Sequence, residues 1–78
     1  MLTFETPHYR SFAAVAHHGS LSAAARAMNL SQPTVSGQIA TLDRQSRVEL
    51  FHRQGYRMSL TSAGQQLLPL AQKLIALE

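Results

Sequence analysis

Apolar residues with helical spacing dominate the first part of the chain. In the stretch from Pro7 to His18, the positions that keep this spacing are Tyr9, Phe12, Ala13 and Ala16. Residues spaced in this way fall on one face of a helix. The sequence therefore predicts a first helix over Pro7 to His18, ended by Gly19, which supplies the large side chains of a hydrophobic core.

A second, shorter helix is predicted between Gly19 and Leu30. Ser20 or Ser22 caps its start, because a serine hydroxyl accepts a hydrogen bond from an unpaired N–H group of the first turn. Its four alanines in five positions let another helix approach closely. Asn29 and Leu30 mark its end, since asparagine tolerates the left-handed conformation that ends many helices.

The third predicted helix, residues 32–44, has two different sides. Ser31 is its N-cap, and Pro33 stands where a missing N–H costs nothing and a preset φ favours the helix. The apolar side has i, i+4 and i+7 spacing and consists of Val35, Ile39 and Leu42. The opposite side is small and polar and contains Pro33, Ser36, Gly37, Ala40 and Arg44, with Gln32 and Thr34 at the exposed start of the helix.

A short helix, a brief turn and a second capped helix make a helix-turn-helix arrangement. A helix with a narrow, polar outer face that is free of acid is suited to the major groove of DNA. The alternative is an ordinary amphipathic helix with a solvated face. Solvated faces are usually rich in Glu and Lys, and this one contains neither, so the pattern favours DNA binding.

Two short β-strands are predicted next, at Val48–Arg53 and Arg57–Leu60. Gln54 and Gly55 between them indicate a tight turn, because glycine adopts a positive φ at no steric cost. Arg53 and Arg57 flank the tip of this hairpin, where they can reach phosphates or a narrow minor groove. The alternative is a pair of solvated surface arginines.

An apolar repeat follows Thr61. The residues that recur with 4-3-4-3 spacing are Ala63, Leu67, Leu70, Leu74 and Leu77. This spacing is typical of a coiled-coil seam, which Leu68, Ala71 and Ile75 widen. A second copy of the chain is the simplest partner for such a helix; the alternative is that the helix packs back on its own domain. No stop signal follows, so we expect a fragment that ends inside this helix.

Charge and composition agree with a small binding domain. The 78 residues make one domain at most, with a formal net charge of +3 and no acidic residue between Glu5 and Asp43. Five arginines lie in the helix-turn-helix and the hairpin: Arg26, Arg44, Arg47, Arg53 and Arg57. The sequence has no cysteine, no signal peptide and no apolar run of membrane-spanning length, which predicts a cytoplasmic protein with no membrane partner.

Neither a catalytic site nor a metal site is expected. His17 and His18 are adjacent in the sequence, so on a helix they point about 100° apart and cannot chelate one ion together. His8 and His52 have no carboxylate or thiol partner nearby in the sequence. No Gly-x-Ser-x-Gly elbow and no glycine-rich phosphate loop is present. We therefore predict that the chain is not an enzyme and binds no metal or cofactor.

From about Tyr9 to Leu77 the chain resembles the LysR-type transcriptional regulators of bacteria. The blocks that match in order and spacing are Phe12–Ala16, Gly19–Ala25, Ser31–Ser36, Gln38–Ile39, Leu42–Asp43, Leu50–Arg53 and Leu60–Gly64. The resemblance implies a mainly α fold. A winged helix-turn-helix, with a three-helix core and a two-stranded β wing, would occupy residues 1–60, and the start of a long linker and dimerisation helix would occupy residues 61–78.

The resemblance also implies a function, which is sequence-specific binding of double-stranded DNA. The recognition helix, about residues 32–44, would enter the major groove, and the wing, residues 50–60, would lie at the neighbouring minor groove. The DNA-binding residues implied are Ser31, Gln32, Pro33, Thr34, Ser36, Gly37, Gln38, Arg53 and Arg57. The dimerisation residues implied are Leu67, Leu70, Leu74 and Leu77. A homodimer through the linker helix, a tetramer of the full-length protein and a further domain that binds a small-molecule effector are also implied.

The chain departs from the family pattern in three places. Gly37 stands where many members have Arg, which removes one groove-facing cation. Ser46 and Arg47 replace a usual Leu-Gly pair, which affects where the recognition helix ends. Tyr56 occupies a wing position that is commonly Arg.

The alternative function is a winged-helix module that binds protein rather than DNA, which an acidic or apolar outer face on the third helix would favour.

Overall fold

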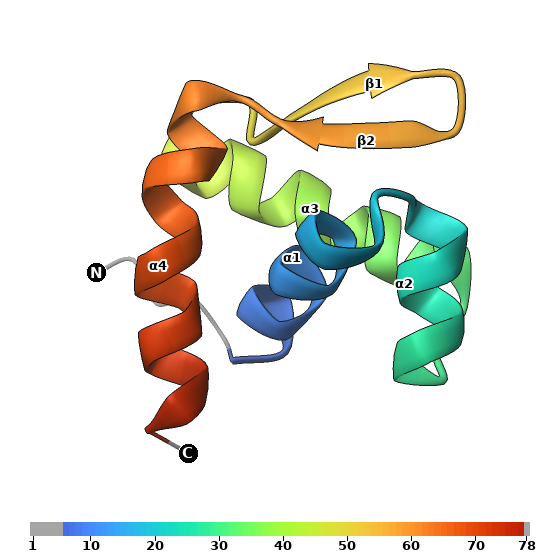
Figure 1. The fold of residues 1–78 in the computed structure, drawn as a ribbon, viewed down its shortest axis with the longest axis horizontal. Helices are drawn as coiled ribbons and strands as arrows, with labels where there is room; N and C mark the ends of the chain where they lie inside the picture. Colours follow the sequence, from blue (N-terminus) through green and yellow to red (C-terminus); the bar gives the residue numbers. More distant parts are fainter. Residues whose placement is uncertain (1–5, 78) are drawn as a thin grey trace.

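The computed structural model describes residues 6–77, so residues 1–5 of the predicted first segment and Glu78 of the predicted linker lie outside it. Figure 1 shows the order of its elements, which are α1 (Thr6–His18), α2 (Leu21–Met28), α3 (Gln32–Ser46), β1 (Phe51–Gln54), β2 (Arg57–Leu60) and α4 (Ser62–Ala76). A helical core with a two-stranded sheet above it confirms the predicted mainly α, winged helix-turn-helix fold.

The core forms where α1 packs against α2, α3 and α4. Its largest fully buried apolar side chains come from α1, α3 and the segment before β1, and are Phe12, Val15, Val35, Ile39, Leu42 and Leu50. The apolar stripe predicted for the third helix is therefore the buried face of α3. In α1 the buried face is Tyr9, Ser11, Phe12 and Val15, whereas Ala13 and Ala16 are only half-buried. Burial of Phe12 and Val15 removes more apolar surface from water than burial of the two alanines would.

Capping residues set both ends of α2 and the end of α3. Ser20 is the N-cap of α2, and its Oγ accepts a hydrogen bond from the N–H of Ala23 at 3.1 Å. Ser22 is an exposed residue inside α2, so the structure decides between the two predicted caps. Asn29 ends α2 in the left-handed conformation, with φ of 59°. Arg47 ends α3 in the same conformation, with φ of 60°, and this places the end two residues after the predicted one.

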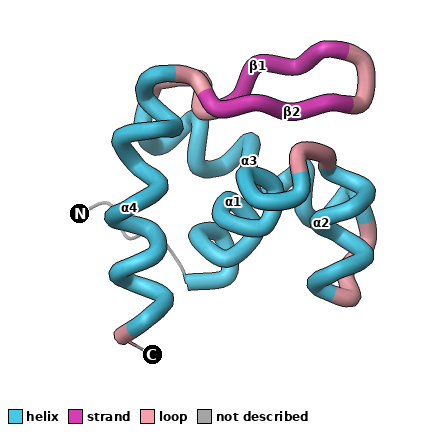
Figure 2. The backbone as a smooth tube through the Cα atoms, viewed as in Figure 1, coloured by secondary structure: helices cyan, strands magenta, loops and turns pink. Residues whose placement is uncertain are grey.

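Figure 2 shows the wing as a two-stranded hairpin. Its strands are antiparallel, and Phe51 pairs with Leu60 and Gln54 with Arg57. The prediction that its first strand begins at Val48 was wrong. Leu50 makes other hydrogen bonds: its N–H donates to Asp43 Oδ1 at 3.2 Å, and its carbonyl accepts from the Thr61 N–H at 3.0 Å. The strand therefore starts after Leu50.

The turn of the wing and its attachment to the helices are also defined. The turn consists of Gly55 and Tyr56, one residue later than predicted, and Gly55 has φ of +62°. A positive φ at the first position of a two-residue turn is the requirement of a type II′ hairpin. On the edge of β2 that faces away from β1, the Met58 N–H donates to the Gly19 carbonyl at 2.8 Å. This bond fixes the wing to the junction of α1 and α2.

Thr61 joins the wing to α4, and three of its hydrogen bonds make this junction. Its hydroxyl donates to the Glu49 carbonyl at 2.6 Å, and the same oxygen accepts from the Gly64 N–H at 3.1 Å as the N-cap of α4. Its N–H donates to the Leu50 carbonyl. Gly64 is buried directly against that carbonyl and the Leu60 side chain. The start of α4 is therefore held closely on the segment that leads into the wing.

The apolar repeat of α4 is divided between the core and the surface. Ala71 is fully buried, and Leu67, Leu68 and Ile75 are partly buried against the core, as the second interpretation of this repeat predicts. In contrast, Leu70, Leu74 and Leu77 remain 56%, 45% and 82% exposed. α4 continues through Pro69 as one helix. One side of α4 thus belongs to the core, while three leucines of the predicted seam have no cover within the described chain.

Candidate nucleic-acid interface

The first turn of α3 is an exposed polar surface. Gln32, Pro33 and Thr34 are exposed, while Ser36 is half-buried. The Ser31 hydroxyl caps the helix by accepting from the Thr34 N–H at 3.2 Å, and it also lies 2.8 Å from Thr34 Oγ1. Ser31 and Thr34 are therefore tied to each other, whereas Gln32 is an exposed residue at the start of the helix.

Further along α3, Gly37, Ala40 and Arg44 are exposed, as predicted for the outer face. The Thr41 hydroxyl donates to the Gly37 carbonyl at 3.0 Å and accepts from Arg44 Nη2 at 3.3 Å. This chain of bonds aligns the Arg44 guanidinium along the helix. Around Gly37 no atom lies within 4 Å of the place a Cβ would take. Packing inside the protein therefore does not explain why this position is a glycine.

Gln38 has a role inside the fold that the sequence did not predict. Its side-chain oxygen accepts a hydrogen bond from the hydroxyl of Ser11, which is fully buried in α1. A buried hydroxyl needs such a partner, because leaving it unpaired costs free energy. The bond joins α1 to α3. The sequence carries no local signal for this bond, because the two residues are 27 positions apart.

The two wing arginines lie on opposite faces of the hairpin. Side chains alternate between the faces of a strand, and directly paired residues share one face. Arg53 pairs with the buried Met58, so it shares the core-facing side with Phe51. Arg57 pairs with Gln54 on the outer side. The two cations therefore belong to different surfaces of the wing. The sequence alone placed both arginines beside the tip and did not distinguish these surfaces.

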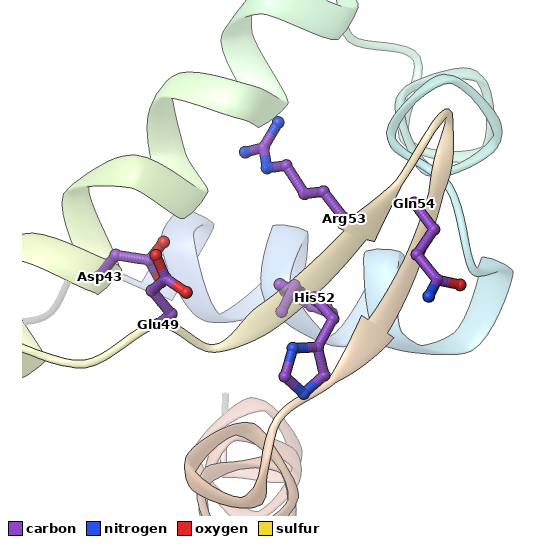
Figure 3. A pocket seen from close by; sticks show the side chains of 6 residues that line it. Asp43, Glu49, His52, Arg53 and Gln54 are labelled. Carbon is purple, nitrogen blue, oxygen red and sulfur yellow. The ribbon is translucent and has the colours of Figure 1, made fainter.

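A hollow of about 380 Å³ lies between the end of α3 and β1 (Figure 3). The carboxylates of Asp43 and Glu49 lie together on one side of it, and Arg53 extends from β1 toward α3. Burial raises the pKa of Asp43, and the charge of Glu49 adds to this; the Leu50 N–H and the charge of Arg53 lower it in part. Asp43 is therefore a structural carboxylate that holds the entry to β1.

A second hollow, of about 300 Å³, joins the wing tip to the helix-turn-helix. Its walls include Ser22 at the start of α2, Gln32 at the start of α3, and Arg53 and Tyr56 from the wing. Arg53 lines both hollows. The predicted DNA-binding residues Gln32 and Arg53, far apart in the sequence, thus share one surface, whereas Arg57 does not line it.

The described part of the chain offers no metal site. Residues 6–77 contain no group of three His, Asp or Glu side chains that could hold a metal ion. His17 and His18 are exposed, with their rings edge to face at 4.8 Å between centroids. Within the same range, no helix is long and apolar enough to cross a membrane.

Sequence comparisons show which known proteins this chain is similar to. The family model of the bacterial regulatory helix-turn-helix proteins of the lysR family matches residues 7–65. An uncharacterized HTH-type transcriptional regulator in the ibpB-leuC intergenic region of Azotobacter vinelandii is 46% identical over 66 residues, covering 85% of this chain and 46% of the relative. A probable RuBisCO transcriptional regulator of Nostoc sp. is 42% identical over 76 residues, covering 97% of this chain and 23% of the relative. The chain therefore spans less than half the length of these relatives.

Solved structures agree. The DNA-binding domain of CbnR, in a complex with DNA, has a TM-score of 0.90 and 33% identity, covering 94% of this chain and 84% of that chain. Corynebacterium glutamicum OxyR (a C206S mutant) has a TM-score of 0.92 and 27% identity, covering 96% of this chain and 23% of that chain. The family and these relatives are transcriptional regulators, not enzymes. The chain therefore belongs to the lysR family of bacterial regulatory helix-turn-helix proteins and forms a DNA-binding domain of that family.

Proposed function

We propose that this domain binds specific double-stranded DNA with α3 in the major groove and the wing at the neighbouring minor groove. The observation that supports this proposal most directly is the exposed first turn of α3, which contains Gln32, Pro33 and Thr34. No acidic residue lies in this turn. The turn also shares one continuous surface with Arg53 of the wing, so groove and phosphate contacts can form together.

Base reading is assigned to the start of α3. A glutamine amide bonds N6 and N7 of adenine in a bidentate manner, and apolar groups contact the methyl of thymine. Gln32 supplies the amide, and Pro33 and the Thr34 methyl supply the apolar groups. Arg53 and Arg57 position the domain on the phosphates without reading sequence. The side-chain oxygen of Gln38 accepts from Ser11, so the DNA contact proposed for Gln38 would use its amide nitrogen.

Two copies are proposed to act together. Leu70, Leu74 and Leu77 form an exposed apolar stripe on α4, and pairing two copies through it would bury that stripe. A symmetric dimer places two recognition helices on two half-sites, so the operator is expected to be a pseudo-palindrome. In the full-length protein we propose a tetramer in the cytoplasm, with a small-molecule effector bound by a separate domain.

The test is a titration of the chain with random and genomic duplexes at about 50 and 200 mM salt. Specific binding predicts one enriched sequence and a steep fall of affinity with salt. Gln32→Ala should weaken the enriched site by roughly 1–3 kcal/mol and relax the preference at one base pair. Gln65→Ala, at an exposed glutamine of α4, is the matched control. Absence of binding at low salt would favour a protein-binding module instead.

A further inference from the structure

The wing tip carries a large aromatic side chain that the fold leaves uncovered. Tyr56 is 83% exposed, whereas Tyr9, Phe12 and Phe51 are buried in the core. It is the second residue of the tight turn, directly after Gly55, where the positive φ belongs to the glycine. Neither the turn geometry nor the core therefore requires an aromatic residue at this position.

Tyr56 and the first turn of α3 lie on the same hollow of the surface. Tyr56 and Gln32 line the same hollow, together with Ser22 and Arg53. This hollow is lined by the wing tip and the first turn of α3, which are the two parts assigned above to the minor and the major groove. Adjacent grooves of a duplex are separated by one sugar–phosphate strand, so a duplex bound in this way passes one strand across the hollow.

We propose that Tyr56 contacts this sugar–phosphate strand, with its ring against a deoxyribose and its hydroxyl donating to a phosphate oxygen. Tyrosine is among the residues that bond phosphate oxygens in protein–DNA complexes. The contact rests on the proposed DNA binding and adds to it a wing contact that carries no charge. A neutral contact releases no counterion, so it contributes affinity without steepening the salt dependence. A neutral side chain is also not attracted to narrow, A-tract minor grooves in the way that a cation is.

The direct test uses the two tyrosines as internal probe and control. The chain is labelled with 3-fluorotyrosine, and its ¹⁹F NMR spectrum is followed during titration with the enriched duplex. Tyr56→Phe assigns the two resonances. We expect the Tyr56 resonance to shift while that of Tyr9, which is only 7% exposed, stays in place. An unmoved Tyr56 resonance on a saturated duplex would overturn the proposal.

Affinity measurements separate the ring from the hydroxyl and from charge. We expect Tyr56→Ala to weaken binding about tenfold with an unchanged salt slope, because no counterion is involved. Tyr56→Phe should weaken binding less than Tyr56→Ala does, since the ring remains. Tyr56→Arg should steepen the slope by about 1 and favour A-tract sites. Wild-type affinity in Tyr56→Ala would contradict the proposal.

The outcome also distinguishes this inference from the proposed function. If Tyr56 makes no contact, the chain still binds the enriched duplex, and Gln32→Ala still weakens that binding. If the chain does not bind DNA at all, no duplex shifts either resonance and none of the variants differs from the wild type. Because Tyr56 is exposed, all three substitutions should leave the thermal unfolding midpoint unchanged, which checks that the fold is intact.

Discussion

Arg53 and Arg57 project from opposite faces of the wing, although both flank its turn. Arg53 lies opposite Met58 on the core-facing side and extends toward α3, while Arg57 lies opposite Gln54 on the outer side. Only Arg53 is placed where its charge acts on Asp43. The two arginines are therefore expected to share an effect on DNA but to differ in their effect on the free protein.

Replacing either arginine with alanine should weaken all duplexes alike and reduce the salt slope by about 1 for each phosphate that is no longer neutralised. Arg57→Lys, which keeps the charge, should retain the slope. Arg53→Ala should in addition raise the pKa of Asp43 further, because a nearby positive charge is removed. Anisotropy titrations at several salt concentrations measure the slopes, and an unchanged slope in Arg57→Ala would show that this arginine is merely solvated.

Gly37→Ala should stabilise the free domain by about 1 kcal/mol, because alanine is the better helix former. A Cβ at this exposed position meets no atom within 4 Å, so no clash offsets the gain. Specific DNA binding should not improve, since the added methyl lies on the face assigned to the major groove. Urea unfolding and duplex titration of the same variant measure both effects. Tighter specific binding would contradict close approach of the helix to DNA at Gly37.

Gly64→Ala should have the opposite effect on stability. A Cβ there would overlap the Leu50 carbonyl and come within 2.8 Å of Leu60 Cδ2. Overpacking of this kind costs roughly 1–3 kcal/mol, which exceeds the gain in helix propensity. The unfolding free energy of Gly64→Ala, compared with that of Gly37→Ala, isolates the clash from the propensity. Equal stabilisation by the two changes would show that α4 shifts freely at this point.

The pH dependence of stability should contain a contribution from Asp43. Because the folded state raises its pKa above 3.8, the folded chain holds this proton more tightly than the unfolded chain. The stabilisation is complete below pH 3.8 and is lost as the pH rises through the higher folded value. Asp43→Asn keeps an oxygen for the Leu50 N–H and removes the titration, so its stability relative to the wild type should increase with pH across this window.

Urea unfolding of the wild type and Asp43→Asn at a series of pH values makes this comparison, in which the other carboxyl groups cancel. Asp43→Ala serves as the control for the hydrogen bond to the Leu50 N–H and should cost about 1 kcal/mol. A constant difference between the wild type and Asp43→Asn at every pH would show that the Asp43 pKa is the same in the folded and unfolded states.

Dimer formation should depend on the exposed leucines of α4. Leu70→Glu combined with Leu74→Glu places charges on the stripe, so the chain should be monomeric, retain its wing and core, and bind a full dyad much more weakly. Gln72→Glu, at an exposed position of the same helix, is the matched control for added charge. Sedimentation at micromolar concentration reports the state of each variant. A monomeric wild type that binds a full dyad tightly and without cooperativity would contradict the dimer.

The sequence predicted the elements of the fold better than their ends. The stripe of Val35, Ile39 and Leu42 specifies the buried face of α3 by periodicity alone. The start of β1 was not predictable in this way, because it depends on bonds from Leu50 to Asp43 and Thr61, which are distant in the sequence. The end of α3 was also missed, since Arg47 adopts a left-handed conformation that usually belongs to glycine.

For the candidate interface, the exposed residues were predicted and their partners were not. Periodicity places Gln32 and Pro33 on the surface, and the structure has both exposed. The bond between Ser11 and Gln38 joins two helices that are separated by α2, so no local pattern reveals it. The opposite orientation of the two wing arginines follows from the register, which in turn depends on the turn residues Gly55 and Tyr56.

Thr61 makes four hydrogen bonds, which join the wing to α4 at a single residue. Its backbone and hydroxyl hold both the segment before the wing and the first turn of α4. The 15 residues of α4 extend about 22 Å from it at roughly 1.5 Å per residue. Because Ala71 is also fully buried in the core, this contact and the bonds at Thr61 together fix the direction in which α4 leaves the wing. In the proposed dimer, that direction would set the distance between the two wings, far from any base.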